Sequence, residues 1–253
     1  MLDRQSYHSD AANREYLSVS QWKDFNDCET RALARLEGRY KQPEKDAFVL
    51  GNYLHAWADG ALDTFCEDWR DTVFGRSGKY AEFKKADQAI RFLEADPIAR
   101  KALDGEHEVI MTGEIGGAPW KIRIDVLGDK RFVDLKYVKD FEPLYSSEQG
   151  SKVSFIEFYD YHIQMAVYQE IIRQNTGKQL EPLILAVTKQ EPPDKAVFGD
   201  FTDDDMNQAL QMVSITLPRI LKLKSGSSTP ISCGRCDYCR REKTITDITP
   251  WKY

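Results

Sequence analysis

The sequence predicts an α/β domain in which a mixed central β-sheet is flanked by helices. Segments with helical periodicity come first, and a cluster of short β-rich runs separated by turns occupies the middle of the chain. A long amphipathic segment then leads to two further β-rich runs and a last helix, an alternation typical of layered α/β domains. With 253 residues, 42% hydrophobic composition and no Pro/Gly/Ser-rich linker, residues 1–253 are expected to form one domain.

The two ends and the overall charge set the expected environment. Residues 1–16 lack the apolar core of a secretory signal, and no apolar run approaches membrane-spanning length. A soluble, cytoplasmic protein without membrane association is therefore expected. The net charge of −6 argues against a general polyanion-binding surface, although the region around residues 121–139 carries a local basic cluster. We expect residues 1–16 to form a flexible arm and residues 225–253 a cysteine-containing C-terminal extension.

Three helices and a short turn are expected in the first 103 residues. The first helix begins at Ser18 or Ser20 as the N-cap, with Gln21 completing a capping-box pattern after Ser18, and runs to about Gly38. Apolar residues at helical spacing predict the others, and charged residues mark the third as exposed. The two further helices are expected at residues 47–69 and 80–93, and the turn at residues 97–103.

A three-stranded antiparallel meander is expected over residues 108–138. Its β-rich runs are separated by a Gly116-Gly117 turn and by a second turn over residues 128–130, as in β-hairpins. The remaining elements follow in order: a polar loop at residues 142–152, a helix at 153–174 ending near Gly177, strands at 180–189 and 196–201, and a helix at 203–224 with acids in its first turn and lysines in its last.

The second hairpin of this meander carries the chemistry. Asp125 lies toward the end of one run, while Asp134 and Lys136 lie two apart on the next and so point to the same face of the sheet. Mg²⁺ is usually held by one or two carboxylates plus substrate oxygens, and a neighbouring ammonium can steady an attacking water. The same residues are also typical of a surface hairpin with a salt bridge.

The cysteines suggest a second centre. Three of the five lie in Cys233-Gly-Arg-Cys236-Asp-Tyr-Cys239, and Cys28 lies near the other end of the chain. The odd number and the spacing suit metal ligation in a reducing compartment better than a secreted disulfide framework. Cys28 is equally typical of an ordinary core cysteine, and Cys66 is interpreted as packing.

Four groups of residues occur in a fixed order: Gly51-Asn-Tyr-Leu-His55, Asp125, Asp134-Leu-Lys136 and Gln164-Met-Ala-Val-Tyr168. Together they resemble the ordered motifs of the PD-(D/E)xK nuclease superfamily, in particular its RecB-like branch and the phage and prophage RecE-type exonucleases. The resemblance spans roughly residues 17 to 240. Ile124 replaces the proline of the nominal motif, a loss that is frequent in this branch.

The resemblance implies a restriction-endonuclease-like core and a ligand set for Mg²⁺ or Mn²⁺. His55, Asp125 and Asp134 would bind the metal, and the backbone carbonyl of Leu135 would be a further oxygen ligand. Glu114, upstream of the hairpin, is a candidate additional acid that no motif aligns.

The remaining motif residues would act on water and substrate. Lys136 would orient or deprotonate the attacking water, with a modestly depressed pKa beside the metal. Gln164 and Tyr168, one helical turn apart, would help to position the scissile strand and Lys136.

The function implied by the resemblance is a Mg²⁺-dependent DNA exonuclease, encoded by a phage or prophage and acting in the bacterial cytoplasm. It would degrade duplex ends in the 5′ to 3′ direction and supply single strands to a recombination annealing protein. A homo-oligomer such as a ring is expected, with salt-sensitive and sequence-independent DNA binding. A single-strand-preferring nuclease of the CRISPR-adaptation type and a non-catalytic nucleic-acid-binding module are the alternatives.

The resemblance also bears on the cysteines Cys28, Cys233, Cys236 and Cys239. In some RecB-like nucleases such a set holds a [4Fe–4S] cluster that joins the two ends of the domain. Zn²⁺ would be bound by the same four thiolates, and metal-free reduced thiols are the third possibility.

Overall fold

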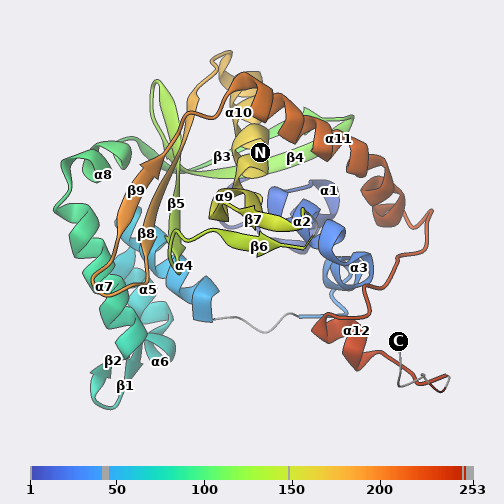
Figure 1. Cartoon of the computed structure of the whole chain (residues 1–253), viewed down its shortest axis with the longest axis horizontal. Coiled ribbons are helices and arrows are strands. Elements are labelled where there is room, and N and C mark those ends of the chain that lie inside the picture. Colours follow the sequence, from blue (N-terminus) through green and yellow to red (C-terminus); the bar gives the residue numbers. More distant parts are fainter. Residues whose placement is uncertain (1, 42–45, 148, 247, 249–253) are drawn as a thin grey trace.

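The computed structural model describes residues 2–41, 46–147, 149–246 and 248. A mixed five-stranded sheet with helices on both faces forms its centre, which confirms the predicted fold class (Figure 1). The helices are α1 (Asp10–Glu15), α2 (Val19–Asp27), α3 (Glu29–Leu36), α4 (Asp46–Ala58), α5 (Leu62–Asp68), α6 (Arg70–Val73), α7 (Ala81–Glu94), α8 (Pro97–Ala102), α9 (Phe155–Phe158), α10 (Tyr161–Thr176), α11 (Asp203–Lys224) and α12 (Asp237–Arg241). The strands are β1 (Phe74–Gly75), β2 (Gly78–Lys79), β3 (Glu106–Ile115), β4 (Ala118–Leu127), β5 (Arg131–Val138), β6 (Leu144–Ser146), β7 (Ser151–Val153), β8 (Glu181–Thr188) and β9 (Lys195–Phe198).

The central sheet has the strand order β3-β4-β5-β8-β9. As expected, β3, β4 and β5 form an antiparallel meander. Strands β5 and β8 pair in parallel, and β9 adds an antiparallel edge to β8. A parallel pair requires a crossover between its strands, and α10 provides it here.

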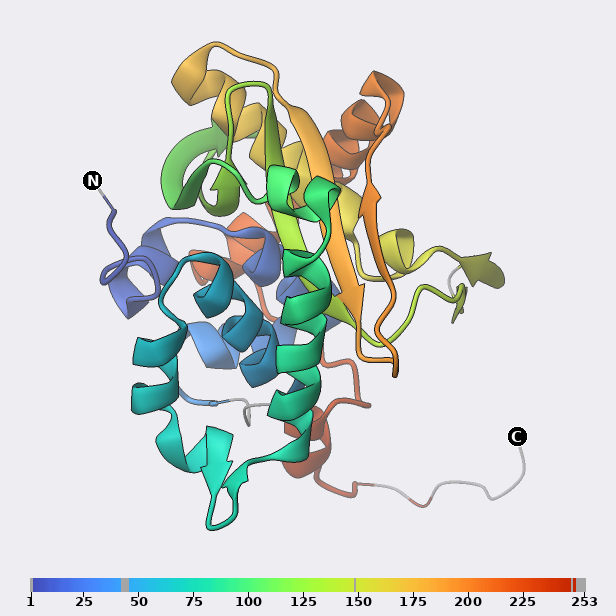
Figure 2. The same ribbon diagram turned by 90° about the vertical axis from the view of Figure 1, so that its left-hand side faces the viewer.

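Each face of the sheet contributes to a separate hydrophobic core. The larger core lies between the sheet and α2, α10 and α11, and includes Phe132 of β5. The other core packs Val133 and Leu135 of the same strand against α4, α7 and α8, which Figure 2 shows in front of the sheet. Because side chains alternate along a strand, Asp134 and Lys136 share the face of Phe132 and point toward α10.

Strands β4 and β5 diverge soon after their turn. They pair through only two residue pairs, Val126 with Val133 and Leu127 with Phe132, whereas β3 and β4 remain paired along most of their length. A polar gap can therefore open within the sheet without breaking either core. Asp125 is the first β4 residue beyond the last β4–β5 pair.

Three predicted helices are each interrupted in the structure. The helix expected from Ser18 or Ser20 to Gly38 breaks at Cys28, whose extended backbone (φ −160°, ψ 105°) separates α2 from α3. The helix expected at residues 47–69 breaks after α4, where Gly60 adopts a positive φ. The helix expected at residues 153–174 divides into α9 and α10 at Asp160, which has φ 52°.

Residues 2–16, expected to form a flexible arm, pack against the domain in the structure. Ser9 caps α1 by accepting a hydrogen bond from the Ala12 N–H. Tyr7 is buried, and its carbonyl accepts a hydrogen bond from the buried Lys121 ammonium, which also donates to Asn13 Oδ1 at 2.7 Å. A buried lysine needs such acceptors, so the sheet itself holds the N-terminal segment in place.

Several short elements lie where the sequence predicted turns or loops. Helix α8 replaces the turn at residues 97–103, and β1 and β2 form a small hairpin. Strands β6 and β7 pair within the predicted polar loop, of which residue 148 lies outside the described residues. In the C-terminal extension, described through residue 246 and at residue 248, α12 lies beside α3. Among the described residues, no helix is long and apolar enough to cross a membrane.

Candidate active site

The predicted polar residues of three elements meet where β4 and β5 diverge. Lys136 Nζ lies 2.6 Å from Asp134 Oδ2 on β5. His55, from α4, places Nδ1 3.4 Å from Asp125 Oδ1 on β4. The Leu135 N–H donates to Asp125 Oδ2 at 2.7 Å, which links the two strands through a side chain at the point where their backbone pairing has ended.

Gln164 joins the two charged groups of β5. Its Nε2 donates to Asp134 Oδ1 at 2.5 Å, and its Oε1 accepts from Lys136 Nζ at 3.4 Å. Tyr161, one turn earlier on α10, lies with its ring centroid 4.8 Å from Lys136 Nζ. The break at Asp160 allows α10 to start here, so both side chains reach β5 from the crossover helix.

Tyr168 lies one turn beyond Gln164 on α10 but does not hydrogen-bond to Asp134 or Lys136 as Gln164 does. Its ring packs beside Phe132, with centroids 6.4 Å apart, and its hydroxyl lies near the Arg123 backbone. Burial raises the pKa of Tyr168 well above its ordinary value, so the phenol stays neutral. This residue supports β4 next to Asp125, whereas the positioning of Lys136 falls to Gln164.

A carboxylate that the sequence motifs did not reveal completes a possible metal site. Ligand atoms of Glu108, His55 and Asp125 all lie within 4.8 Å of one another. The β3–β4 register pairs His107 with Val126 and Val109 with Ile124, so Glu108 lies opposite Asp125. Its φ of 56° is unusual for a residue other than glycine, and Arg123 Nε lies 2.9 Å from its Oε2.

The hairpin turn could have identified Glu108. A two-residue Gly116-Gly117 turn fixes which residues face each other along both strands, and that register places Glu108 opposite Asp125. Glu114, the acid proposed instead, lies near the turn. Its backbone is bound there by the Gln174 side chain at 2.9 and 2.8 Å, and it is not among the grouped ligands.

The electrostatics of the site separate the two aspartates. Burial acts to raise the pKa of Asp125, but His55, Lys136 and the Leu135 N–H lower it below its ordinary value. Burial raises the pKa of Asp134 despite the adjacent Lys136. Burial would lower the pKa of Lys136, but Asp134 and Asp125 raise it above the ordinary value, and the depressed pKa expected beside a bound metal stays a prediction. The protein alone therefore keeps Lys136 as an ammonium.

A second lysine, not singled out from the sequence, approaches the site from α2. Lys23 Nζ lies 5.3 Å from the Tyr161 ring centroid and donates to the Tyr159 carbonyl at 2.5 Å. Burial lowers its pKa to about 8. Lys23 and Lys136 thus place two cationic groups next to one aromatic ring, an arrangement that favours an anion such as a phosphate between or beside them.

The donor set fits a hard divalent cation. His55, Glu108 and Asp125 offer one nitrogen and two carboxylates, which suit Mn²⁺ or Mg²⁺. Asp134 Oδ2 is buried and accepts no hydrogen bond of good geometry, although the Lys136 ammonium is close. A buried oxygen with unused acceptor capacity is what a nearby cation would satisfy.

Two cavities border the site. One of about 490 Å³ is lined by His55, Glu108 and Arg123 among others. Another of about 770 Å³ is lined by residues that include Lys23 and Asp160. The first cavity therefore contains two of the grouped ligands, whereas the second contains Lys23 and none of them.

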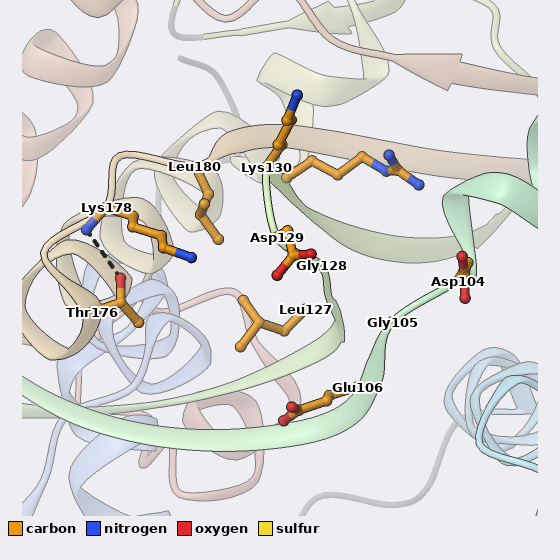
Figure 3. A pocket seen from close by; sticks show the side chains of 11 residues that line it. Asp104, Gly105, Glu106, Leu127, Gly128, Asp129, Lys130, Thr176, Lys178 and Leu180 are labelled. Atoms are coloured by element: carbon orange, nitrogen blue, oxygen red, sulfur yellow. Dashed lines mark hydrogen bonds between the residues drawn. The ribbon is translucent and has the colours of Figure 1, made fainter.

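A separate pocket of about 690 Å³ lies at the turn between β4 and β5. Figure 3 shows its charged side chains spread around it, with Asp104 and Glu106 apart from Lys130 and Lys178. None of the predicted site residues lines this pocket.

The basic residues of the hairpin do not gather on one surface. Lys121 is buried and binds the N-terminal segment. Arg131 donates to the Lys101 carbonyl at the far turn, while Lys136 belongs to the active site. The local basic cluster seen in the sequence is therefore dispersed by the fold.

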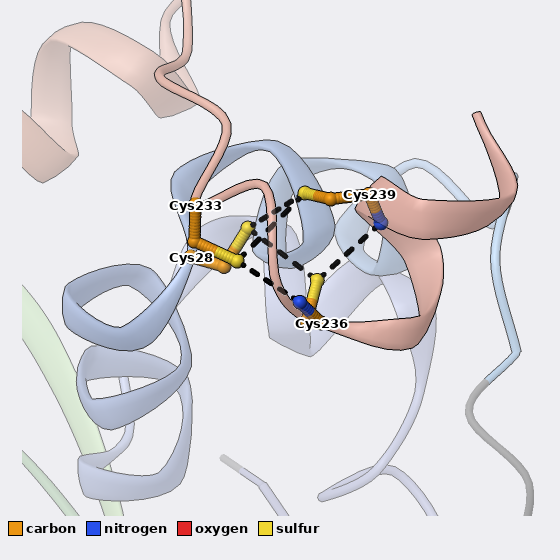
Figure 4. A group of neighbouring side chains, drawn as sticks. All are labelled: Cys28, Cys233, Cys236 and Cys239. Atoms are coloured by element: carbon orange, nitrogen blue, oxygen red, sulfur yellow. Dashed lines mark hydrogen bonds between the residues drawn. The ribbon is translucent and has the colours of Figure 1, made fainter. Parts of the chain in front are cut away.

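The four cysteines expected to act together do meet, at a place distinct from the carboxylates. The sulfurs of Cys28, Cys233, Cys236 and Cys239 lie within 4.8 Å of one another (Figure 4). They belong to a small cluster between α3 and α12. Cys66 is not part of this group.

Comparisons with known proteins agree with this geometry. A family model described as a PDDEXK-like domain of unknown function (DUF3799) matches residues 18–242. The crystal structure of a protein from Eubacterium rectale, named provisionally as an exonuclease, superposes with a TM-score of 0.94 at 36% identity, over 99% of this chain and 96% of that one. The structure of SSO0001 covers 83% of this chain and 93% of that chain, but its TM-score of 0.28 and 14% identity carry no argument.

No curated protein matches the sequence significantly. The family model and the Eubacterium rectale structure both support a nuclease. The family match covers most of the chain and includes every motif residue from His55 to Tyr168. The chain therefore belongs to the DUF3799 family of PDDEXK-like domains, within the PD-(D/E)xK nuclease superfamily.

Proposed function

We propose that this protein is a Mg²⁺- or Mn²⁺-dependent DNA exonuclease that hydrolyses phosphodiester bonds at duplex ends. The observation that carries the proposal is the joint placement of Asp125, Asp134 and Lys136 with His55 at the gap between β4 and β5. The 36% identical Eubacterium rectale protein, named provisionally as an exonuclease, supports the same activity.

Residues from three elements would bind the metal. His55, Glu108 and Asp125, whose ligand atoms lie within 4.8 Å of one another, would hold the divalent cation. The resemblance adds Asp134 and the Leu135 carbonyl as further candidate ligands. A bound cation of this kind neutralises charge at the phosphate and activates water for attack. The protein's contribution is to fix the ligands before substrate arrives.

Lys136 acts as a donor in this proposal. Asp134 and Asp125 raise its pKa, and its ammonium can donate a hydrogen bond to the attacking water or to a phosphate oxygen. Gln164 holds both Lys136 and Asp134 in place. Lys23 adds a second positive charge for the phosphate.

The finer features of the proposal rest on the resemblance to RecE-type enzymes. These are 5′ to 3′ polarity, a homo-oligomer such as a ring, delivery of single strands to an annealing protein, and action in the cytoplasm of a bacterial host of a phage or prophage. Light scattering of the purified protein tests the oligomer, and a single monomeric species would contradict it.

The main experiment uses a linear duplex labelled at the 5′ or at the 3′ end of one strand. With Mg²⁺ or Mn²⁺ we expect early release of the 5′ label as a mononucleotide, and no release with chelator. Early release of the 3′ label would reverse the polarity. Faster digestion of a single strand would favour the CRISPR-adaptation type of nuclease, and DNA binding without digestion in either metal would favour the non-catalytic module and overturn the proposal.

A further inference from the structure

The cysteine cluster contains distances that distinguish one metal ion from a larger cluster. Cys28 Sγ lies 3.5 Å from Cys239 Sγ and 3.8 Å from Cys236 Sγ, and Cys233 Sγ lies 3.9 Å from Cys239 Sγ. All four sulfurs lie within 4.8 Å of one another, and all are free thiols. Figure 4 shows them pointing into a common centre from α12, the segment before it and the α2–α3 break.

These separations match a tetrahedron around a single ion. Sulfurs about 2.3 Å from one Zn²⁺ in tetrahedral geometry lie about 3.8 Å from each other. In a [4Fe–4S] cluster each cysteine binds a different iron, so the four thiolates surround the whole cluster and must be farther apart. The cluster implied by the sequence resemblance therefore does not fit between these sulfurs.

The backbone around the cysteines is shaped for thiolates. The Cys236 N–H donates to Cys233 Sγ at 3.3 Å, and the Cys239 N–H donates to Cys236 Sγ at 3.4 Å. Gly234 has φ 69°, which lets the chain turn tightly between the first two cysteines. Such donors outside the coordination sphere stabilise and orient thiolate ligands.

The hydrophobic cluster around the cysteines is much smaller than the two cores of the sheet. Its buried apolar residues are few: Cys28, Ala34, Tyr40, Tyr238 and Cys239. Two of these are cysteines of the cluster itself. Four thiols packed together also bring no opposite charge of their own, in contrast to the paired carboxylates and cations of the active site.

We propose that Cys28, Cys233, Cys236 and Cys239 bind one Zn²⁺ ion in a closed structural site. Four protein ligands leave no open coordination position, so the site takes no part in catalysis. The ion joins the C-terminal segment to the break between α2 and α3 across 211 residues of sequence. It thereby anchors the end of α2, the helix that carries Lys23 to the active site.

The test is the metal content of the intact protein, purified without oxygen from cells supplied with both iron and zinc. We expect one zinc per chain, negligible iron and a colourless solution. About four irons per chain with visible charge-transfer absorption would overturn the proposal in favour of a cluster. Five titratable thiols, those of the cluster and of Cys66, with neither metal would overturn it as well.

A matched pair of variants locates the zinc. Cys28→Ser is expected to lose most of the bound zinc, whereas Cys66→Ser, which changes the cysteine outside the cluster, is expected to retain one zinc per chain. Equal zinc content in the two variants would contradict the assignment. Because Cys28→Ser could fold poorly, Co²⁺ replacement in the unaltered chain provides a second measurement. Visible bands of tetrahedral thiolate coordination are expected, and their absence would count against the site.

Discussion

The active site and the cysteine cluster both join distant parts of the chain, but they are stabilised differently. The carboxylates and cations lie at a gap between two inner strands of a sheet that has a hydrophobic core on each face. The four cysteines lie in a much smaller cluster between α3 and α12. In the active site, the charged side chains hold one another in place without a metal. In the cysteine cluster, the proposed ion accounts for the close approach of four thiols.

The contacts within each group explain this difference. In the active site Lys136 is next to Asp134 and His55 is next to Asp125, so positive and negative groups offset each other. Among the cysteines the neighbours are other sulfurs, two backbone N–H groups and the Ser232 hydroxyl, which donates to Cys239 Sγ at 2.9 Å. Changes in the active site should therefore alter catalysis more than stability, and changes in the cysteine cluster should do the reverse.

The largest effect is expected for Asp134→Asn. The substitution keeps the shape of the side chain but removes a charged ligand, so cleavage in Mg²⁺ should fall on the order of 10³-fold or more. Rates of end digestion at saturating metal measure this effect. Circular dichroism should show a folded protein, and digestion within tenfold of the original rate would contradict the catalytic assignment.

The largest effect on stability is expected for Cys28→Ser. Loss of one thiolate should remove the zinc and cost about 3 kcal/mol, which corresponds to a fall in Tm of roughly 6–12 °C for a chain of this size. Calorimetry of this variant beside Asp134→Asn tests the comparison directly. If both variants lowered Tm equally, the proposed division between catalysis and stability would be wrong.

Gln164→Ala should produce an intermediate effect through metal binding. Gln164 orients Asp134 and Lys136 without being a ligand itself, and loss of such a partner typically weakens metal affinity about 10–100-fold. The Mg²⁺ concentration required for half-maximal cleavage should rise accordingly. Gln164→Glu, which retains the acceptor for Lys136 but loses the donor to Asp134, should not restore it. An unchanged metal requirement in Gln164→Ala would contradict the positioning role.

The smallest effect is expected for Lys23→Met, which removes a cation from beside Tyr161. Binding of DNA should weaken by about tenfold or less, and the slope of log K against log salt should decrease by about one. Fluorescence anisotropy over a range of salt concentrations measures both quantities. Lys84→Met, on the exposed surface of α7, is the control and should leave the slope unchanged.

Local sequence patterns predicted the fold class, the order of the main elements, and Asp125, Asp134 and Lys136. The resemblance to PD-(D/E)xK nucleases added His55 and Gln164, which meet them in the structure. Alternation along β5 was sufficient to place Asp134 and Lys136 on one face, because side-chain direction in a strand depends only on residue parity. The register of the hairpin also places Glu108 opposite Asp125, although none of the sequence motifs includes Glu108.

Only the tertiary structure decided the features that depend on partners distant in sequence. The N-terminal segment is ordered because Lys121 binds it, and the breaks at Cys28 and Asp160 are set by the cluster and the sheet that these segments approach. The pKa of Lys136 is raised despite its burial, because the fold places Asp134 and Asp125 beside it. The cysteine motif indicates which residues bind a metal, but not how far apart the fold holds their sulfurs. Those distances, which only the structure gives, distinguish a single ion from an iron–sulfur cluster.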